Sequence, residues 1–245
     1  MRRLELIGVT GLPEVRPGDD LGELIAANTQ LEAGDILVVA QKVVSKAEGR
    51  LVELASITAS DQATRIASRL VARPDPRMVQ VVLDESVRVL RSERVLITET
   101  RHGFVCANSG VDHSNVGGRD VLTLLPVDPD ASAARLRERL RALTGVEVGV
   151  IVSDTFGRPW RLGIVNVALG VAGLPAVVDL RGTLDDDGKP LRATVLAVAD
   201  EIAAAAGPVM GKTDRTAAVI LRGLDLSGDG KGKDLIRAAA EDLFR

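Results

Sequence analysis

Residues 128–152 read DPDASAARLRERLRALTGVEVGVIV, and this stretch decides the fold class. An Asp-Pro pair starts a segment with helical spacing, in which Leu136, Leu140 and Leu143 lie on one face of the helix. The arginines of this segment are expected on the solvent-exposed face. The residues VEVGVIV that follow are apolar, as in a buried strand. This strand is predicted to end abruptly where the polar sequence SDTFGRPWR, residues 153–161, begins. A long helix that leads into a buried strand indicates a protein that combines helices with a sheet.

Further helices and strands are expected on both sides of this stretch. Strands are expected at 4–9, 36–40, 176–182 and 216–224, with a hairpin or meander at 87–107. Helices are expected at 21–30, 60–73, 193–207 and about 234–244, and a further helix is expected to start at Asp75-Pro76. Residues 162–178 are expected in the buried core, and 208–215 in a loop. Because helices and strands alternate irregularly, the predicted class is mixed α/β (α+β) rather than a doubly wound sheet. No repeat or shift in composition marks a boundary. We therefore expect one functional unit over residues 1–245, with two interleaved sub-domains.

The composition excludes several classes of function. Lys and Arg total 31 against 34 for Asp and Glu, and aromatic residues are 2% of the chain, which argues against nucleic-acid binding. One cysteine and two histidines cannot form a disulfide framework, a cysteine-cluster metal site or a histidine-rich zinc centre. The longest uncharged run, 162–178, is shorter than the roughly 20 residues of a membrane-spanning helix. With no apolar leader at the start, the expected location is the cytoplasm.

Two polar loops carry residue types suited to a divalent metal. SGVDHSNVG, residues 109–117, contains Asp112, His113 and Asn115, and SDTFGRPWR contains Asp154 and Thr155. Acidic and hydroxyl oxygens are hard ligands, so Asp112, Asp154 and Thr155 would suit Mg²⁺ or Mn²⁺ if the loops converge. The alternative is structural: Asp112 as a turn residue and Asp154 as a helix cap.

Basic residues near these loops suggest contacts with phosphate. Arg158 and Arg161 lie within a turn of Asp154 in sequence, and guanidinium groups beside metal-binding carboxylates suit a phosphate clamp. Lys46, expected at a strand end, is a further candidate for a phosphate contact, and the alternative is an isolated lysine that is simply exposed. For both arginines, too, a solvated structural role is the alternative.

Three further motifs do not support the sites that they resemble. GPVMGKTD, residues 207–214, is one residue short of a P-loop and stands between a helix and a strand in the wrong order. Gly211 and Lys212 could still contact phosphates. DLSGDG, residues 225–230, lacks the final glutamate of a calcium loop. Cys106 lies in an apolar run and is expected in the core.

Five strings in order resemble one known family. They are GLPEVRPGDDL (11–21), DILVVAQKVVSKAEGR (35–50), ANSGVDHSNV (107–116), VIVSDTFGRPWRLG (150–163) and GPVMGKTDR (207–215). Together they resemble the coenzyme F-420:L-glutamate ligase family over about residues 4–224. The family includes single-domain archaeal enzymes and the N-terminal domain of a two-domain actinobacterial enzyme. This chain ends before the nitroreductase-like flavin-binding domain of the latter could begin, so it is a single-domain enzyme or an excised domain.

The resemblance implies a GTP-dependent amide ligase. Such an enzyme joins L-glutamate to the lactyl-phosphate carboxylate of an 8-hydroxy-5-deazaflavin precursor through an acyl phosphate, and can extend the tail through γ-linkages. It also implies Mg²⁺ or Mn²⁺ with K⁺, and an intertwined homodimer. The implied metal ligands are Asp112, Asp154 and Thr155, and Asp112, Asp154 and Arg158 are the expected catalytic residues.

The resemblance also assigns the nucleotide contacts. They are Gly11, Leu12, Pro13, Glu14, Gln41, Lys42, Lys46, Asn115 and, in a late mobile loop at about 208–215, Met210, Gly211 and Lys212. Gln41 departs from the family, because some members carry Ser there. Two other classes stay open: a related ligase with a different carboxylate acceptor, and a non-catalytic nucleotide-binding module.

Overall fold

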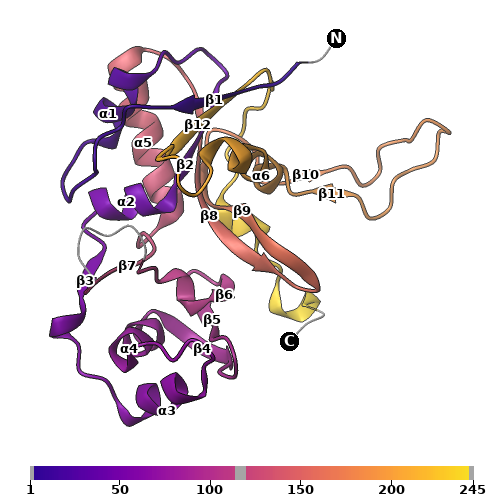
Figure 1. The fold of residues 1–245 in the computed structure, drawn as a ribbon. Coiled ribbons are helices and arrows are strands. Elements are labelled where there is room, and N and C mark those ends of the chain that lie inside the picture. The colour runs from indigo at the N-terminus through magenta and orange to yellow at the C-terminus, as the bar shows by residue number, and fades with distance from the viewer. Residues whose placement is uncertain (1–2, 114–119, 243–245) are drawn as a thin grey trace.

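The computed structural model describes residues 3–113 and 120–242, and its centre is a five-stranded mixed sheet (Figure 1). The strand order is β1 (Glu5–Val9), β12 (Ala218–Arg222), β2 (Ile36–Ala40), β8 (Gly149–Arg158) and β9 (Arg161–Ala172). Only β2 and β8 are parallel neighbours, while the other pairs are antiparallel. The mixed α/β class expected from the sequence is confirmed.

Helices cover both faces of this sheet, because the apolar residues of its strands alternate in direction. Leu37 and Val39 of β2 belong to the core beneath α1 (Leu21–Asn28), α2 (Gln41–Ala47) and α5 (Pro129–Thr144). Ile36 and Val38 belong to the opposite core, beneath α6 (Val198–Met210). A continuous apolar run is what a strand buried on both faces requires. The result is a three-layer arrangement of helices, sheet and helix.

The longest helix, α5, owes its limits to local sequence. Asp128 accepts a hydrogen bond from the Ala131 N–H, and Pro129 occupies the first turn, where its missing N–H costs nothing. Gly145 ends the helix with a left-handed conformation, φ 70°. Leu136 and Leu140 are buried against the sheet, as the leucine spacing predicts, whereas Leu143, predicted on the same face, is 40% exposed near the end of the helix.

Residues between α2 and α5 form a second body with its own core. It contains β3 (Leu51–Glu53), η1 (Leu54–Ser56), α3 (Asp61–Arg69), α4 (Pro76–Asp84), β4 (Ser86–Arg91), β5 (Ile97–Thr100), β6 (Val105–Ala107), η2 (Asn108–Gly110) and β7 (Val121–Thr123). Strands β4, β5 and β6 form the meander predicted for 87–107, and Asp75 caps α4 as predicted. Figure 1 shows this inserted unit below the central sheet. Its core is the cluster around Leu96 and Leu122.

The prediction that the strand at 146–152 ends abruptly at the polar residues is wrong. β8 continues through SDTFGR to Arg158 and pairs with β9 from Asp154↔Val167 to Arg158↔Arg161. The ladder satisfies the backbone groups, so polar side chains do not end the strand. The expected buried core at 162–178 holds for its second half but not for Leu162 and Ile164, which are 98% and 58% exposed.

The end of the chain also departs from the expected elements. The helix expected at 234–244 is replaced, in the part that the structure describes, by short 3₁₀ turns η3 (Gly232–Leu235) and η4 (Ala239–Glu241). The Asp130 carboxylate accepts the Gly232 N–H at 2.6 Å, and the Leu174 carbonyl accepts the Gly230 N–H at 3.0 Å, which anchors this segment against the sheet. The loop expected at 208–215 begins later, because α6 includes Pro208 and ends at Met210.

Two short strands complete the described structure. β10 (Val178–Asp179) pairs with β11 (Val195–Leu196), and together with the residues between them they extend from the body as an arm (Figure 1). In the described ranges no helix is both long and apolar enough to cross a membrane.

Candidate functional site

Most of the predicted site residues meet where the parallel pairing of β2 with β8 stops. These strands are parallel, and Ala40 lies opposite Ser153 as their last pair. The residues that follow Ala40 and Ser153 in the chain therefore lie at the same end of the sheet. Lys42 follows β2 on α2, and Asp154 follows Ser153 within β8. In open mixed sheets, the crevice at the carboxyl ends of parallel strands is the usual ligand site. The topology therefore brings together side chains far apart in sequence.

Asp112 joins this group from the inserted unit. Its backbone exchanges two hydrogen bonds with Thr123, of 3.0 and 2.8 Å, which positions it beside the end of β7. Lys42 Nζ lies 2.6 Å from Asp112 Oδ2. The negative charge of Asp112 reaches Asp154, where it contributes to raising the pKa of that carboxyl. The two acidic segments therefore lie close enough for the charge of Asp112 to act on Asp154.

Burial dominates the electrostatics of Asp154. Loss of water raises the pKa of its carboxyl above the usual range, and Asp112 raises it further. The Thr155 backbone N–H, which donates to Asp154 Oδ1 at 2.7 Å, and the positive charges of Lys212 and Lys42 oppose this rise. A half-buried carboxyl in such surroundings is a good partner for a cation.

Lys212 approaches from the segment after α6. Its ammonium donates to Thr155 Oγ1 at 2.9 Å. Gly211, directly before it, ends α6 with φ 57°, and Met210 is buried, with its sulfur accepting from Asn166 Nδ2 at 3.4 Å. The end of α6 therefore fixes where Lys212 leaves the helix.

The GLPE loop lies beside α2. Lys46 is buried and its ammonium lies 2.5 Å from Glu14 Oε1. The expectation that Lys46 stands at a strand end is wrong, because residues 41–47 form α2. Gly11 has φ 81°, and Leu12 packs against the central core. Pro13 is exposed between Leu12 and Glu14.

Gln41 is oriented inward rather than toward solvent. It is buried, and its Nε2 donates to Ser45 Oγ at 2.6 Å and to the Leu124 carbonyl at 3.1 Å. These bonds connect α2 to the segment that follows β7. Gln41 therefore holds together the two bodies that supply Lys42 and Asp112.

Three predicted residues are not placed with this group: Arg158 and its strand partner Arg161, which lie at the hairpin tip, and Asn115. Arg158 is within a turn of Asp154 in sequence, but in an extended strand four residues span about 13 Å. Its guanidinium donates to the Leu162 carbonyl at 2.7 Å near the hairpin tip. The difference arises because the segment is a strand and not a compact loop. Asn115 lies outside the described residues.

Sequence reasoning missed three polar side chains near the carboxylates. Asn166 pairs with Thr155 across the hairpin. Thr123 Oγ1 and Ser153 Oγ are buried and lack a hydrogen-bond partner within the described ranges. Each adjoins a site carboxylate, Thr123 as the bridge partner of Asp112 and Ser153 as the neighbour of Asp154. No spacing rule signals them, because cross-strand pairing alone brings them there.

Cys106 is in the core, as predicted, but it also lies close enough to Asp154 to be affected by its charge. Burial and that charge raise the pKa of the Cys106 thiol to about 12. The thiol is therefore neutral at physiological pH, and it forms part of the apolar wall near Asp154 rather than a nucleophile.

The donor set fits a hydrated hard cation. Among the residues that the structure describes, no group of three or more acidic, histidine or cysteine side chains could hold a metal. Mg²⁺ commonly takes one or two carboxylates and leaves its other positions to water and phosphate oxygens. Asp112 and Asp154 supply that number of carboxylates, and the buried Thr123 and Ser153 hydroxyls, which lack a partner within the described ranges, belong to the same two segments.

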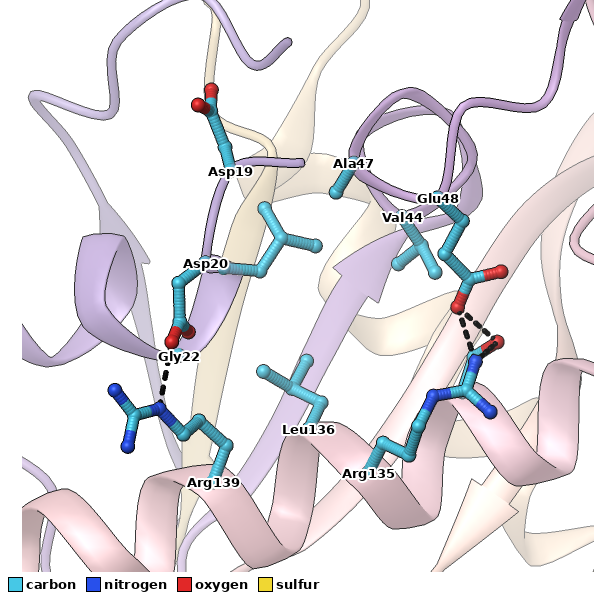
Figure 2. Close-up of a pocket in the computed structure, with 11 residues that line it drawn as sticks. Asp19, Asp20, Gly22, Val44, Ala47, Glu48, Arg135, Leu136 and Arg139 are labelled. Atoms are coloured by element: carbon cyan, nitrogen blue, oxygen red, sulfur yellow. Dashed lines mark hydrogen bonds and ion pairs between the residues drawn. The ribbon is translucent and has the colours of Figure 1, made fainter. Parts of the chain in front are cut away.

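A separate hollow lies on the other side of α2. Its volume is about 210 Å³. Figure 2 shows that the lining residues come from α1, α2 and α5 and the segments beside them. Its walls carry the ion pairs Arg139–Asp20 at 2.7 Å and Arg135–Glu48 at 2.6 Å. No residue of the predicted site lines it. These ion pairs connect α5 to α1 and α2.

Comparison with known proteins identifies the family. The sequence model of the F420-0:Gamma-glutamyl ligase family matches residues 10–223, which include every described site residue. The chain belongs to this family. The predicted resemblance is thus confirmed, and this F420-0:gamma-glutamyl ligase family member is an amide-bond-forming ligase.

Individual relatives agree over nearly the whole chain. The coenzyme F420:L-glutamate ligase of Methanopyrus kandleri is 48% identical, with 95% of this chain and 94% of the relative covered. The protein of that name from Methanocaldococcus jannaschii is 44% identical, covering 100% and 98%. The one from Archaeoglobus fulgidus is 45% identical, covering 99% and 97%. Ligase-family relatives and this chain are therefore of matching length.

Proposed function

We propose that this chain uses GTP to join L-glutamate to the lactyl-phosphate carboxylate of an 8-hydroxy-5-deazaflavin precursor, in coenzyme F420 biosynthesis. Its relatives are named for F420 and L-glutamate. The observation that carries the proposal is the meeting of Asp112 and Asp154 with Lys42 and Lys212 at the end of the central sheet. Paired carboxylates and ammonium groups suit a nucleotide phosphate chain and its cation.

The acceptor carboxylate is a poor electrophile and must be activated before an amide can form. A free carboxylate does not condense with an amine in water, so we propose that an acceptor carboxylate oxygen first attacks the γ-phosphorus of GTP. This gives an acyl phosphate and GDP. The glutamate amine then attacks the acyl carbon, phosphate leaves, and the amine loses a proton. The same two steps on the newly added γ-carboxylate would extend a poly-γ-glutamate tail.

The protein's own residues would bind and align the reactants. Lys42 and Lys212 would contact phosphate oxygens, since both ammonium groups already lie against site oxygens. Correct alignment alone can supply roughly 7–11 kcal/mol of such a barrier. The remaining proposed nucleotide contacts are Gly11, Leu12, Pro13, Glu14, Gln41, Lys46, Asn115, Met210 and Gly211.

Asp112, Asp154 and Thr155 would hold Mg²⁺ or Mn²⁺, with K⁺ as a monovalent companion. When bound, the divalent ion supplies positive charge against the phosphate oxygens during phosphoryl transfer. The half-buried Asp154 carboxyl, whose pKa is raised, supports this assignment because a cation would favour its charged form. Arg158 is proposed to contact the acceptor further along the hairpin.

We also propose that the functional unit spans residues 1–245 and works as an intertwined homodimer with interleaved sub-domains. The main sheet takes strands from both sides of the inserted unit, which supports interleaving along the chain. Leu184 and Val195 are 68% and 45% exposed on the arm or its base, and apolar surface of this kind supports self-association.

A mass-spectrometric ligation assay tests the proposal. It contains the deazaflavin precursor, L-glutamate, Mn²⁺, K⁺ and either GTP or ATP. The expected product gains one or more glutamyl units with GTP. Addition of glutamyl units with ATP but not with GTP would contradict the proposed nucleotide. If folded protein that binds GTP added no glutamyl unit, the proposed acceptor would be wrong.

Variants locate the chemistry in the proposed site. Asp154→Ala is expected to abolish ligation while the protein stays folded, and Lys46→Ala is expected to raise the KM for GTP several-fold. Glu93→Ala, which removes an exposed carboxylate of the inserted unit, is the matched control. Near-normal turnover of Asp154→Ala at limiting Mn²⁺ would exclude the metal assignment, and an unchanged KM would exclude Lys46 from the phosphate site.

A further inference from the structure

The tip of the β8–β9 hairpin presents the chain's only tryptophan to solvent. Pro159 and Trp160 form the loop between the paired residues Arg158 and Arg161. Trp160 is 82% exposed and has φ 56°, a left-handed conformation that is unfavourable for a bulky side chain. Leu162, two residues later, is 98% exposed. A strained backbone that holds the largest aromatic side chain outward indicates a function at the tip.

We propose that Trp160 is a stacking platform for the planar heteroaromatic ring of the acceptor. This inference rests on the proposed function, because it assigns the ring-binding end of the same substrate. An exposed indole offers a wide flat face, and such faces bind planar nitrogen heterocycles by offset stacking. The exposed Leu162 side chain adds apolar surface beside it.

The span from the carboxylates to the start of the hairpin tip is close to the length of such a substrate. Asp154 precedes Arg158 by four strand residues, or about 13 Å, and Trp160 lies just beyond Arg158. The acceptor's reacting carboxylate and its ring are joined by a lactyl unit, a phosphate and the polyol of a flavin-type ring. This arm has about ten single bonds, which extend to about 12 Å at the advance per bond of an extended chain. A carboxylate placed near Asp154 would therefore put the ring near the hairpin tip.

The hairpin is built to hold this spacing. Nine pairs connect β8 to β9, from Val150↔Ala172 to Arg158↔Arg161. At the tip, the Arg158 guanidinium donates to the Leu162 carbonyl at 2.7 Å, and Gly163 with φ 87° accommodates the register shift there. Arg158 and Arg161 flank the loop, so their positive charges lie along the path of an anionic arm.

Intrinsic fluorescence reports directly on this side chain. The sequence contains one tryptophan and no tyrosine, so emission excited at long wavelength comes from Trp160 alone. Titration with an 8-hydroxy-5-deazaflavin that carries the lactyl-phosphate arm is expected to quench this emission in a saturable way. Lactyl phosphate without a ring should leave the emission unchanged. Equal quenching by both, or by neither, would overturn the inference.

Kinetics of variants give a second readout. Trp160→Ala is expected to raise the KM for the acceptor about tenfold with the KM for GTP unchanged, and Trp160→Phe to restore most of the affinity, because stacking needs only a flat ring. Val71→Ala, which trims an exposed apolar side chain of the inserted unit, is the matched control.

The outcomes separate this inference from the proposed function. If the wild type ligates glutamate while Trp160→Ala keeps a normal KM for the acceptor, the stacking role is wrong and the function stands. A normal KM together with a change of oligomeric state would show that a second copy of the chain covers Trp160, and would likewise overturn it. If the wild type ligates nothing, the proposed function fails, and calorimetric comparison of acceptor binding by the wild type and Trp160→Ala still decides whether the ring binds at Trp160.

Discussion

Replacement of Phe104 by alanine tests whether packing between the two bodies sets the geometry of the site. Phe104 belongs to the inserted unit, and its ring meets the Phe156 ring of β8 edge-on, with centroids 6.2 Å apart and planes at 74°. Leu125 and Leu169, both 1% exposed, complete this junction. The inserted unit carries Asp112, and β8 carries Asp154 two residues before Phe156. The junction therefore controls the separation of the two carboxylates.

The expected loss of stability follows from burial. Phe104 is 8% exposed, and truncation of a buried phenylalanine to alanine costs about 3–5 kcal/mol, which includes the edge-on contact. A native domain of ordinary stability, about 5–15 kcal/mol, remains mostly folded after this loss. A displacement of only about 1 Å at a reacting group can lower the rate about 100-fold. We therefore expect turnover of the folded variant to fall much more than its folded fraction.

Leu140→Ala is the matched control. Leu140 of α5 is fully buried in the central core, away from the junction, and its truncation costs a comparable amount of about 2–5 kcal/mol. Urea unfolding followed by circular dichroism gives the free energy of unfolding of each variant, and the ligation assay, run where both are folded, gives turnover. Equal turnover for Phe104→Ala and Leu140→Ala would refute the reasoning, because loss of stability alone would then explain both.

Two further predictions concern buried titratable groups. The pKa of the Cys106 thiol is raised to about 12, so iodoacetamide at pH 8 should leave this thiol unmodified in the native protein and alkylate it in urea. Mass spectrometry measures both labelling rates. Equal rates in the native and unfolded protein would show that the thiol is not buried. Burial also raises the pKa of Asp200, whose carboxylate accepts the Ala168 N–H at 2.8 Å, so its contribution to the free energy of unfolding should increase as pH falls through that pKa. Asp200→Asn should flatten this pH dependence and raise stability at neutral pH, while Asp200→Ala should be about 1 kcal/mol less stable than the asparagine variant because the N–H loses its acceptor. Thermal unfolding over a range of pH decides, and a steeper dependence for the asparagine variant would contradict the prediction.

Local sequence was sufficient for the elements whose limits are set within a few residues. Helix α5 begins and ends at residues that act locally: Asp128 caps its start, Pro129 occupies its first turn and the left-handed Gly145 ends it. The apolar run 36–40 likewise becomes a strand buried on both faces. The strings shared with the ligase family could also be recognised from the sequence, because they are runs of consecutive residues and do not depend on strand pairing.

Tertiary pairing decided what local sequence predicted wrongly. SDTFGR reads as a polar loop, yet the backbone of β9 supplies its hydrogen bonds and extends the strand to Arg158. At the end of the chain, an alanine-rich stretch with good helical propensity forms only 3₁₀ turns within the described residues. The bond from Gly232 to Asp130 fixes the start of that segment.

The sequence by itself determined the class of fold, the chemical types of the site residues and the family, because these depend on composition, periodicity and short strings. Only the tertiary structure decided that Asp112 meets Lys42 and Asp154, while Arg158 and Trp160 stand apart at the hairpin tip. The physical reason is that separations in space follow from strand pairing and from the packing of the inserted unit against β8. Both depend on residues distant in the chain, and no local pattern encodes them.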